Sequence, residues 1–403
     1  MNLKHVTFGM MLFLLAGLTA AAQSASSQDT IPPSQDTLQL GAARFGEYLP
    51  VLGTRKVGLV VNQTTVLEGG GHLVDTLLAR GVRITAIFAP EHGYRGNVER
   101  GESFATTRDS ATGITVYSIY GSRRKPAKED LRDVEVMVFD MQDVGARFFT
   151  YISTLHYVME ACAENNIPLL VLDRPNPLGY YVDGPVLDPK FKSFIGMHPI
   201  PVVHGMTIGE YARMINGEGW LANGAQCNLT VVPVAGYHHN AFYSVPVRPS
   251  PNLPDMKSVY LYPTVCLFEG TNVSEGRGTE KPFQVFGAPY FKGGNGSFTP
   301  RSIPVLSLKP KHEGQRCGGY DLSGTPLSAL QAIRRLELRY LLEFYRQAPD
   351  KAKFFGNTFD LLAGSDALRK QITAGLSEAR IRESWQPGLA AFREMRKKYL
   401  LYE

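Results

Sequence analysis

Between residues 56 and 233 the sequence alternates short apolar runs with longer amphipathic segments, and this alternation limits the fold more than any other feature. The apolar runs, rich in β-branched residues, lie at 57–61, 84–88, 134–139, 169–172 and 229–232. Segments of helical length and pattern lie at 72–80, 150–164 and 207–216. Because strands that alternate with helices form mainly parallel sheets covered by helices, this region predicts a Rossmann-like α/β domain.

From residue 235 onward Pro, Gly, Asn and aromatic residues become frequent, and the regular alternation ends. Strand-like runs lie at 259–262 and 303–308, and helical patterns lie at 326–347, 366–373 and 387–399. We therefore expect a Rossmann-like catalytic domain at 38–235 and a smaller C-terminal α+β domain at 236–403 that completes the cleft.

The first residues have the pattern of a secretory signal peptide: Lys4 supplies a positive charge, residues 6–18 are apolar, and the small residues at 20–22 suit cleavage. We expect a signal peptide at 1–22 and a flexible leader at 23–37, which is rich in Ser, Gln, Asp and Pro. No Cys stands near the apolar stretch to carry a lipid, and the stretch is short for a membrane span. The sequence thus predicts an exported protein, periplasmic or secreted, without stable membrane insertion.

Charge and motif content argue against several partners and cofactors. The formal net charge is +5, and removing Lys4 with the signal peptide leaves 5 − 1 = +4. Basic residues are scattered, and we interpret Arg123, Arg124 and Lys125 as a solvated turn, so nucleic acid is not an expected partner. Neither G-x-G-x-x-G nor a P-loop follows a strand, so no nucleotide cofactor is expected. The four cysteines lack Cys-x-x-Cys spacing and His-Glu-x-x-His is absent, so we expect no metal and leave cysteine pairing open.

Polar residues follow four of the predicted strands. In an open α/β sheet the ligand crevice lies beyond the carboxyl ends of the strands, so such residues are candidates for a binding site. The candidates are Asn62, Glu91, His92, Asp140, Asp143, Arg147, Asp173, Arg174 and Asn176. The alternative interpretation is that some of them cap helices or form Asx turns, as Asp and Asn often do after strands.

Glu91 in Ala-Pro-Glu-His-Gly-Tyr-Arg-Gly is the first candidate for proton transfer, since a carboxylic acid among apolar neighbours can protonate a leaving-group oxygen. His92 beside it would be a metal ligand or a base, on weaker grounds. Whether one of Asp140 and Asp143 is structural stays open. Arg147 either binds an anion through its guanidinium fork or neutralises these aspartates.

A second polar cluster occupies residues 266–280, where Glu, Asn and Arg stand between glycines. Such a loop suits contact with a polyhydroxylated ligand, and Glu269 or Glu275 would act with Glu91 as a pair of carboxyl groups. A salt-bridged Gly turn is the alternative. The segment 248–254, Arg-Pro-Ser-Pro-Asn-Leu-Pro, is either a stiff extended linker or a wall of the cleft.

Several stretches, in order along the chain, resemble the NamZ exo-β-N-acetylmuramidase family. They are Val-Asn-Gln-Thr (61–64), Ala-Pro-Glu-His-Gly-Tyr-Arg-Gly (89–96), Phe-Asp-Met-Gln-Asp-Val-Gly-Ala-Arg-Phe-Phe-Thr-Tyr (139–151), Leu-Asp-Arg-Pro-Asn-Pro-Leu-Gly (172–179), Gly-Pro-Val-Leu-Asp (184–188), Pro-Ile-Pro-Val-Val-His-Gly-Met-Thr (199–207), Ser-Pro-Asn-Leu-Pro (250–254) and Phe-Glu-Gly-Thr-Asn-Val-Ser-Glu-Gly-Arg-Gly-Thr (268–279). The resemblance implies a Rossmann-like domain joined to a smaller C-terminal domain, with the site in a cleft. It also implies release of terminal N-acetylmuramic acid from peptide-free cell-wall saccharides without a nucleotide cofactor, and it makes Glu91 the catalytic glutamate.

The predicted function is therefore an exo-β-N-acetylmuramidase that removes N-acetylmuramic acid from the non-reducing end of peptidoglycan fragments, with Glu91 as general acid. The second carboxylate stays open among Asp143, Glu269 and Glu275, as does participation of the substrate's acetamido group. For the lactyl carboxylate of the sugar we expect one of three cations: Arg147, Arg174 or Arg277. The other candidates for substrate binding are Asn62, His92, Asp140, Asp173, Asn176, His204, Asn252 and Asn272.

Two other functions stay open at this point. A non-catalytic muropeptide-binding or sugar-binding protein would keep its function in a Glu91→Gln variant. A metal-dependent cell-wall amidase or esterase would be inhibited by a chelator. The expected partners are peptidoglycan-derived saccharides, and the sequence does not predict the oligomeric state.

Overall fold

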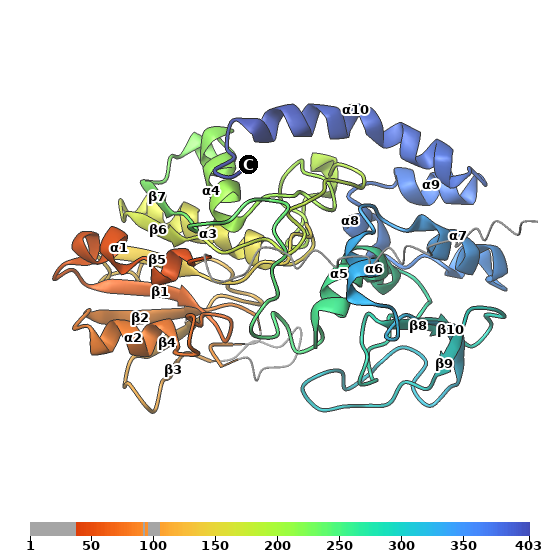
Figure 1. The fold of residues 1–403 in the computed structure, drawn as a ribbon, viewed down its shortest axis with the longest axis horizontal. Helices are drawn as coiled ribbons and strands as arrows, with labels where there is room; N and C mark the ends of the chain where they lie inside the picture. The colour runs from red at the N-terminus through yellow and green to blue at the C-terminus, as the bar shows by residue number, and fades with distance from the viewer. Residues whose placement is uncertain (1–37, 92, 96–104) are drawn as a thin grey trace, which may run out of the picture. The chain divides into compact units, whose positions relative to one another are not determined.

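The computed structural model describes residues 38–91, 93–95 and 105–403. The expected signal peptide (1–22) and leader (23–37) lie outside the described residues. The fold contains a seven-stranded sheet, a three-stranded sheet and helices around both (Figure 1). This architecture confirms the predicted α/β class with a Rossmann-like, mainly parallel sheet and a smaller second domain.

The larger sheet has the strand order β3-β4-β2-β1-β5-β6-β7, and all neighbours are parallel except β3 and β4. Its strands are β1 (Val57–Val61), β2 (Ile84–Ala89), β3 (Thr107–Arg108), β4 (Thr115–Ser118), β5 (Val136–Asp140), β6 (Leu169–Leu172) and β7 (Leu229–Val232). The five predicted apolar runs all form strands of this sheet, whereas β3 and β4 are too short and too polar to be predicted as strands. Every residue of β1 and β5 is buried, as expected for parallel strands that are covered on both faces.

Helices cover the two faces of this sheet in pairs. Alternate residues of a strand point to opposite faces, so Val60 of β1 packs in one apolar cluster and Leu59 in the other. The cluster with Leu59 contains residues of α1 (Phe45–Leu52) and α2 (Leu73–Ala79). The cluster with Val60 contains residues of α3 (Tyr151–Glu164) and α4 (Ile208–Gly217) and continues into the second sheet.

The smaller sheet is antiparallel, with the order β8-β10-β9. Its strands are β8 (Val285–Ala288), β9 (Gly296–Phe298) and β10 (Cys317–Asp321). The helices of this part are α5 (Met256–Val265), α6 (Leu327–Gln331), α7 (Leu338–Gln347), α8 (Phe359–Ala363), α9 (Ala367–Thr373) and α10 (Glu378–Lys397). Short 3-10 helices are η2 (Gly41–Ala43), η3 (Pro189–Phe191), η4 (Ala222–Gly224), η5 (Cys266–Gly270) and η6 (Lys351–Lys353).

The predicted strand at 259–262 is wrong, because these residues lie inside helix α5. Their β-branched and aromatic composition favours a strand, but a local cap decides otherwise. The side chain of Asp255 accepts a hydrogen bond from the backbone N–H of Ser258, and the Ser258 hydroxyl lies 3.3 Å from the backbone nitrogen of Asp255. This capping box starts a helix directly before the apolar run.

Three further boundaries differ from the prediction. The run 303–308 forms turns closed by a bridge between Ile303 and Ser307, and Pro304 removes a donor that a ladder would need. The helix expected at 326–347 is divided into α6 and α7. The helix expected at 387–399 is the later part of α10, which begins at Glu378 after the cap Ser377. Pro387 favours a helix start, yet here it lies inside the helix.

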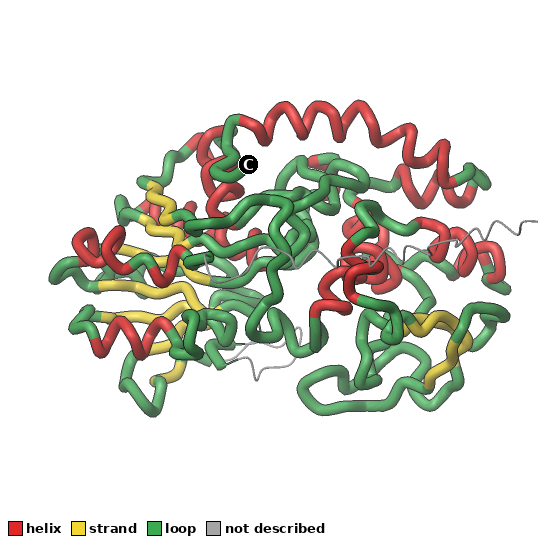
Figure 2. Tube along the Cα trace, in the orientation of Figure 1, coloured by secondary structure: helices red, strands yellow, loops and turns green. Residues whose placement is uncertain are grey.

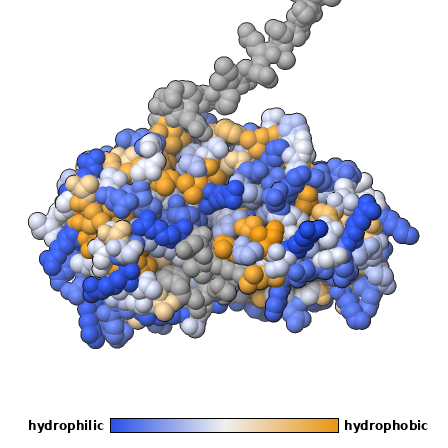
Figure 3. All heavy atoms as spheres, turned by 90° about the horizontal axis from the view of Figure 1, so that it is seen from below, coloured by the Kyte–Doolittle hydropathy of each residue, from blue (hydrophilic) through white to orange (hydrophobic). Residues whose placement is uncertain are grey.

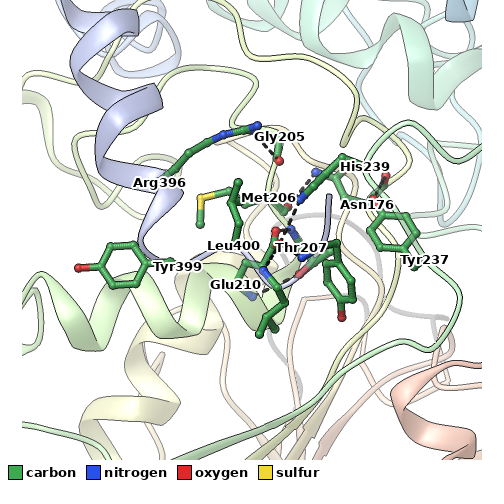
Figure 4. A network of polar contacts seen from close by, with 12 residues as sticks. Asn176, Gly205, Met206, Thr207, Glu210, Tyr237, His239, Arg396, Tyr399 and Leu400 are labelled. Carbon is green, nitrogen blue, oxygen red and sulfur yellow. Dashed lines mark hydrogen bonds and ion pairs between the residues drawn. The ribbon is translucent and has the colours of Figure 1, made fainter.

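Helix α10 and the residues after it connect the later part of the chain to the larger sheet. Near the start of α10, Arg382 Nη2 donates to Asp183 Oδ2 at 2.6 Å. Near its end, Arg396 Nη1 donates to the carbonyl oxygen of Gly205 at 2.9 Å (Figure 4). The backbone N–H of Leu401 donates to Glu210 Oε1 at 2.8 Å. Residues at the end of the described chain therefore complete contacts inside the predicted domain 38–235.

Loops rather than helices or strands form much of the chain between these elements (Figure 2). On the face drawn in Figure 3, hydrophilic residues are interspersed with small groups of hydrophobic residues. Among the described residues, none of the helices has the length and apolar character needed to cross a membrane.

Candidate active site

A cavity of about 540 Å³ lies where loops from the carboxyl ends of the larger sheet meet residues that follow position 250. The sheet side contributes Glu91 after β2, Tyr120 after β4 and Thr150 at the start of α3. The described residues that line the cavity are Glu91, Tyr120, Arg124, Phe148, Phe149, Thr150, Tyr151, Phe194, Ile195, Ser250, Tyr262, Cys266, Glu269, Glu275, Arg277, Ser307, Lys309, Pro310, Lys311, Thr358 and Leu362. Four residues predicted for the site are therefore brought together: Glu91, Glu269, Glu275 and Arg277.

Glu91 is half-buried, and two hydroxyl groups orient its carboxyl group. Tyr120 donates a hydrogen bond to Oε1 at 2.9 Å, and Thr150 donates to Oε2 at 3.3 Å. Thr150 is the N-cap residue of α3, so a helix end fixes its position. Two donors that arise from different loops restrict the carboxyl group to one orientation toward the cavity.

Two further carboxyl groups of the site, those of Glu269 and Glu275, belong to a network of ion pairs around Arg277. Arg277 Nη2 donates to Glu269 Oε1 at 2.8 Å, and its Nε lies 3.4 Å from Glu275 Oε1. Lys311 Nζ reaches the other oxygen of Glu275 at 3.1 Å. Residues 266–280 thus combine both interpretations of the sequence: they form a Gly-rich turn with salt bridges, and the same turn lies beside the cavity. Its salt bridges orient two carboxylates that also line the cavity.

Lys311 also organises the backbone of this loop. Its ammonium group donates to the carbonyl oxygens of Phe268 at 2.7 Å, Glu269 at 3.1 Å and Val273 at 3.1 Å. A charged donor shared by three carbonyl groups and one carboxylate fixes the path of the loop that carries Glu269 and Glu275.

Aromatic side chains form much of the remaining wall. Phe149 and Tyr151 meet edge to face with ring centroids 4.7 Å apart, and Phe148 and Tyr262 do the same at 5.3 Å. Burial raises the pKa of the Tyr151 hydroxyl well above its usual range, so this group is a neutral hydrogen-bonding partner. Aromatic walls with a few directed polar groups are typical of small-molecule sites.

Asp140 and Arg174 are not among the described residues that line the cavity. They form a fully buried ion pair in which Arg174 Nε and Nη2 donate to the two carboxylate oxygens at 2.5 and 2.9 Å. Arg174 also donates to the carbonyl oxygen of Val66 at 3.0 Å. Asn62 nearby accepts from the backbone N–H of Thr64 at 2.9 Å in an Asx turn. These three predicted site residues organise the ends of β1, β5 and β6.

Asp173 and Asn176 hold the start of α4 rather than facing the cavity. Asp173 accepts from the backbone N–H of Gly209 at 2.7 Å and from the hydroxyls of Thr207 and Tyr402 at 2.7 and 2.6 Å. A Cβ at Gly209 would lie 2.6 Å from Cγ of Asp173, so this close approach requires glycine. Burial raises the pKa of Asp173 to about 6. Asn176 Nδ2 donates to the carbonyl oxygen of Met206 at 2.8 Å (Figure 4).

Arg147 is fully buried and binds only backbone carbonyl groups among the described residues. Its guanidinium donates to Pro185 at 2.8 Å, Ile200 at 2.8 Å and Leu362 at 2.9 Å. Burial without a carboxylate partner lowers its pKa to about 9. Arg147 therefore links the chain before α4 to helix α8. Its guanidinium is fully buried among these carbonyl groups and does not face the cavity.

The other predicted residues are placed as follows. Asp143 accepts from the backbone N–H of Gly145 at 2.7 Å, and His204 Nε2 lies 3.6 Å from the same oxygen. Asn252 Nδ2 donates to Leu306 at 2.9 Å, and Asn272 Oδ1 accepts from Tyr290 at 3.1 Å. None of Asp143, His204, Asn252 and Asn272 is among the described residues that line the cavity. His92 lies outside the described residues.

Sequence reasoning did not single out Tyr120, Thr150 or Lys311, and it interpreted Arg124 as part of a solvated turn. Tyr120 and Arg124 follow β4, which contains no long apolar run, so the sequence does not show that they lie at the carboxyl end of a strand. Thr150 was predicted as the first residue of a helix, which was the available signal for a fixed hydroxyl group. Where the chain is described, there is no group of three or more His, Cys, Asp or Glu side chains placed to hold a metal ion.

Comparisons with known proteins agree on one family. Residues 57–257 match the model for the N-terminal part of exo-β-N-acetylmuramidase NamZ, and residues 260–402 match the model for its C-terminal part. The peptidoglycan β-N-acetylmuramidase NamZ of Bacillus subtilis (strain 168) is 38% identical over 412 aligned residues, which cover 98% of each chain. Two crystal structures of DUF1343 family proteins from Bacteroides fragilis are similar. One has a TM-score of 0.84 and 43% identity, and the other 0.75 and 31%; each alignment covers 91% of this chain and 99% of the other. The chain belongs to the exo-β-N-acetylmuramidase NamZ family.

Proposed function

We propose that this protein is an exo-β-N-acetylmuramidase that releases N-acetylmuramic acid from the non-reducing end of peptide-free peptidoglycan fragments. The observation that carries the proposal is the cavity in which Glu91 and the ion-paired Glu269 and Glu275 line the same space. Most glycoside hydrolases use two such carboxyl groups that flank the glycosidic bond. The name of the Bacillus subtilis relative supports peptidoglycan as the source of the substrate.

In the proposed mechanism Glu91 acts as the general acid. Tyr120 and Thr150 orient its carboxyl group, and its proton passes to the glycosidic oxygen as the bond from that oxygen to C1 of the sugar breaks. The leaving saccharide departs with a new hydroxyl group. Positive charge develops at C1 and the ring oxygen, where a negative carboxylate stabilises it.

Glu269 and Glu275 are the candidates for this second carboxylate. Arg277 and Lys311 fix their orientation, so either of them can face C1 directly or orient the acetamido oxygen of the substrate. Water then adds to C1 and gives one proton to a carboxylate of the site, which yields free N-acetylmuramic acid. Asp143 is the weaker candidate, because it does not line the cavity among the described residues.

The test is release of the chromophore from a chromogenic β-N-acetylmuraminide by the wild-type protein and by Glu91→Gln. We expect a loss of at least about 100-fold in kcat for the variant, since a general acid contributes roughly that much or more. Glu129→Gln is the matched control, because Glu129 is exposed and does not line the cavity. Glu269→Gln and Glu275→Gln, measured alongside, identify the second carboxylate by the larger loss.

Three results would contradict the proposal. If Glu91→Gln retains wild-type turnover, Glu91 is not the acid. If the wild-type protein binds N-acetylmuramic acid in calorimetry but releases no sugar from any muraminide, the protein is a sugar-binding protein instead. Loss of activity in the presence of a chelator, restored by a divalent metal, would favour a metal-dependent hydrolase.

We also propose that the protein acts after export, in the periplasm or outside the cell. The pattern of a signal peptide at 1–22 supports this location. Mass spectrometry of the protein from a cell fraction would give its first residue. A first residue near position 23 in the periplasmic or culture fraction is expected, and an intact Met1 in the cytoplasmic fraction would contradict export.

A further inference from the structure

The basic side chains that line the cavity differ in whether they already form an ion pair with a carboxylate. Four basic side chains line it: Arg124, Arg277, Lys309 and Lys311. Arg277 lies between Glu269 and Glu275, and Lys311 contacts Glu275 and three backbone carbonyl groups. The charge of these two cations is therefore already balanced by Glu269 and Glu275, although Nε and Nη1 of Arg277 make no hydrogen bond among the described residues. Arg124 and Lys309 are exposed, and neither forms an ion pair with a residue that the structure describes.

Arg124 is the better placed of these two for binding a ligand. Its guanidinium lies over the ring of Phe194, 4.5 Å from the centroid. The Phe194 ring meets the Tyr120 ring at 5.9 Å, and Tyr120 donates its hydrogen bond to Glu91. Two aromatic side chains thus connect Arg124 to Glu91 along one wall. A guanidinium that stacks on a ring keeps the N–H groups at its edge available for a planar carboxylate.

The substrate proposed above brings a carboxylate into this cavity. N-acetylmuramic acid differs from N-acetylglucosamine by a lactyl ether whose free end is a carboxylate, and a peptide stem on that group would turn it into a neutral amide. The cavity already contains the carboxyl groups of Glu91, Glu269 and Glu275. Another negative charge therefore needs a cation that is not yet paired.

We propose that Arg124 binds the lactyl carboxylate of the terminal sugar and thereby selects peptide-free muraminides. This inference rests on the proposed function. It replaces the three arginines expected from the sequence: Arg147 and Arg174 are buried with other partners, and Arg277 is paired with two glutamates. Arg124 is a specificity residue, because it contacts a substituent of the sugar and not the bond that breaks.

The experiment uses two substrates that differ only in charge: a chromogenic β-N-acetylmuraminide and the same compound with its lactyl carboxylate converted to a primary amide. The wild-type protein should prefer the acid. In Arg124→Gln, kcat/KM for the acid should fall by about 10- to 100-fold, mainly through KM, as expected for the loss of a hydrogen-bonded charge pair. The preference for the acid over the amide should disappear, and Arg124→Lys should restore part of it.

Arg123→Gln is the matched control. Arg123 is the neighbouring exposed arginine, it pairs with Asp130, and it does not line the cavity. Its acid-to-amide preference should equal that of the wild type. An unchanged preference in Arg124→Gln, or an equal loss for both substrates, would overturn the inference.

Failure of the proposed function gives a different result. If the wild-type protein releases no sugar from either substrate, the muramidase proposal fails. Calorimetry with free N-acetylmuramic acid and its lactyl amide then decides the role of Arg124. Weaker binding of the acid alone in Arg124→Gln supports the carboxylate site, and equal binding by both proteins refutes it.

Discussion

Asp173 gives the structure its clearest link between pH and stability. The carboxyl group is fully buried at the start of α4, and burial raises its pKa to about 6 in the folded protein from an ordinary value of 3.8. The folded state therefore binds this proton more tightly than the unfolded state. Stability from this group is complete below about pH 4 and falls as the pH rises to about 6, where the folded protein must hold a buried negative charge.

The size of this effect follows from the change in pKa. A rise from 3.8 to about 6 corresponds to about 3 kcal/mol of unfolding free energy lost between acidic and neutral pH. Asp173→Asn keeps the size of the side chain and removes the proton. The hydroxyls of Thr207 and Tyr402 can rotate to accept from the new amide group, so the fold should be retained.

Urea unfolding of the wild type and of Asp173→Asn across about pH 4 to 7 measures the difference. The free energy of unfolding of the variant should gain about 2.5 kcal/mol relative to the wild type from the acidic to the neutral end. Asp75→Asn, at an exposed position in α2, is the control and should follow the wild type. Parallel curves for Asp173→Asn and the wild type would refute the argument that burial dominates at this carboxyl group.

Three further predictions concern other parts of the molecule. Arg147→Met leaves three buried carbonyl groups without their donor, so urea unfolding should show a loss of about 3–5 kcal/mol; a loss below about 1 kcal/mol would contradict the linking role. Lys311→Met frees the loop that carries Glu275, so kcat/KM should fall about 10-fold or more while the chain stays folded by circular dichroism, and unchanged kinetics would count against loop positioning. None of the four buried cysteines, all of which the structure describes, is in a disulfide, so labelling in denaturant without reductant should detect four thiols; two or none would indicate disulfides.

The larger sheet was predictable because its signal is local. Strand β5 is buried along its whole length, and its first four residues, 136–139, are apolar, as expected for a strand covered on both faces. Helix α5 was not predictable from the same signal, because Val259 and Tyr260 favour a strand by composition. The capping box at Asp255 outweighs that preference by fixing the chain direction before the run begins.

The candidate site was predictable only in part, for a reason that lies in distant contacts. Glu91 and Asp140 both stand at the end of a strand, yet Glu91 lines the cavity and Asp140 faces Arg174. Position after a strand is the same in both cases. Asp140 differs because it pairs with Arg174, which lies 34 residues later in the chain. In the same way, Arg147 is bound by the carbonyl group of Leu362, 215 residues later. No local pattern contains that information.

The contacts of the last described residues have a consequence for biosynthesis. Tyr402 completes the hydrogen bonds of Asp173 from a position 229 residues later in the chain, and Leu401 does the same for Glu210. On a ribosome the whole sheet is synthesised well before these partners exist. A nascent chain that stops after β7 therefore leaves two carboxyl groups at the start of α4 incompletely paired. We expect such a fragment to depend on chaperones, and the sheet to reach its final stability only when residues 401 and 402 have been added.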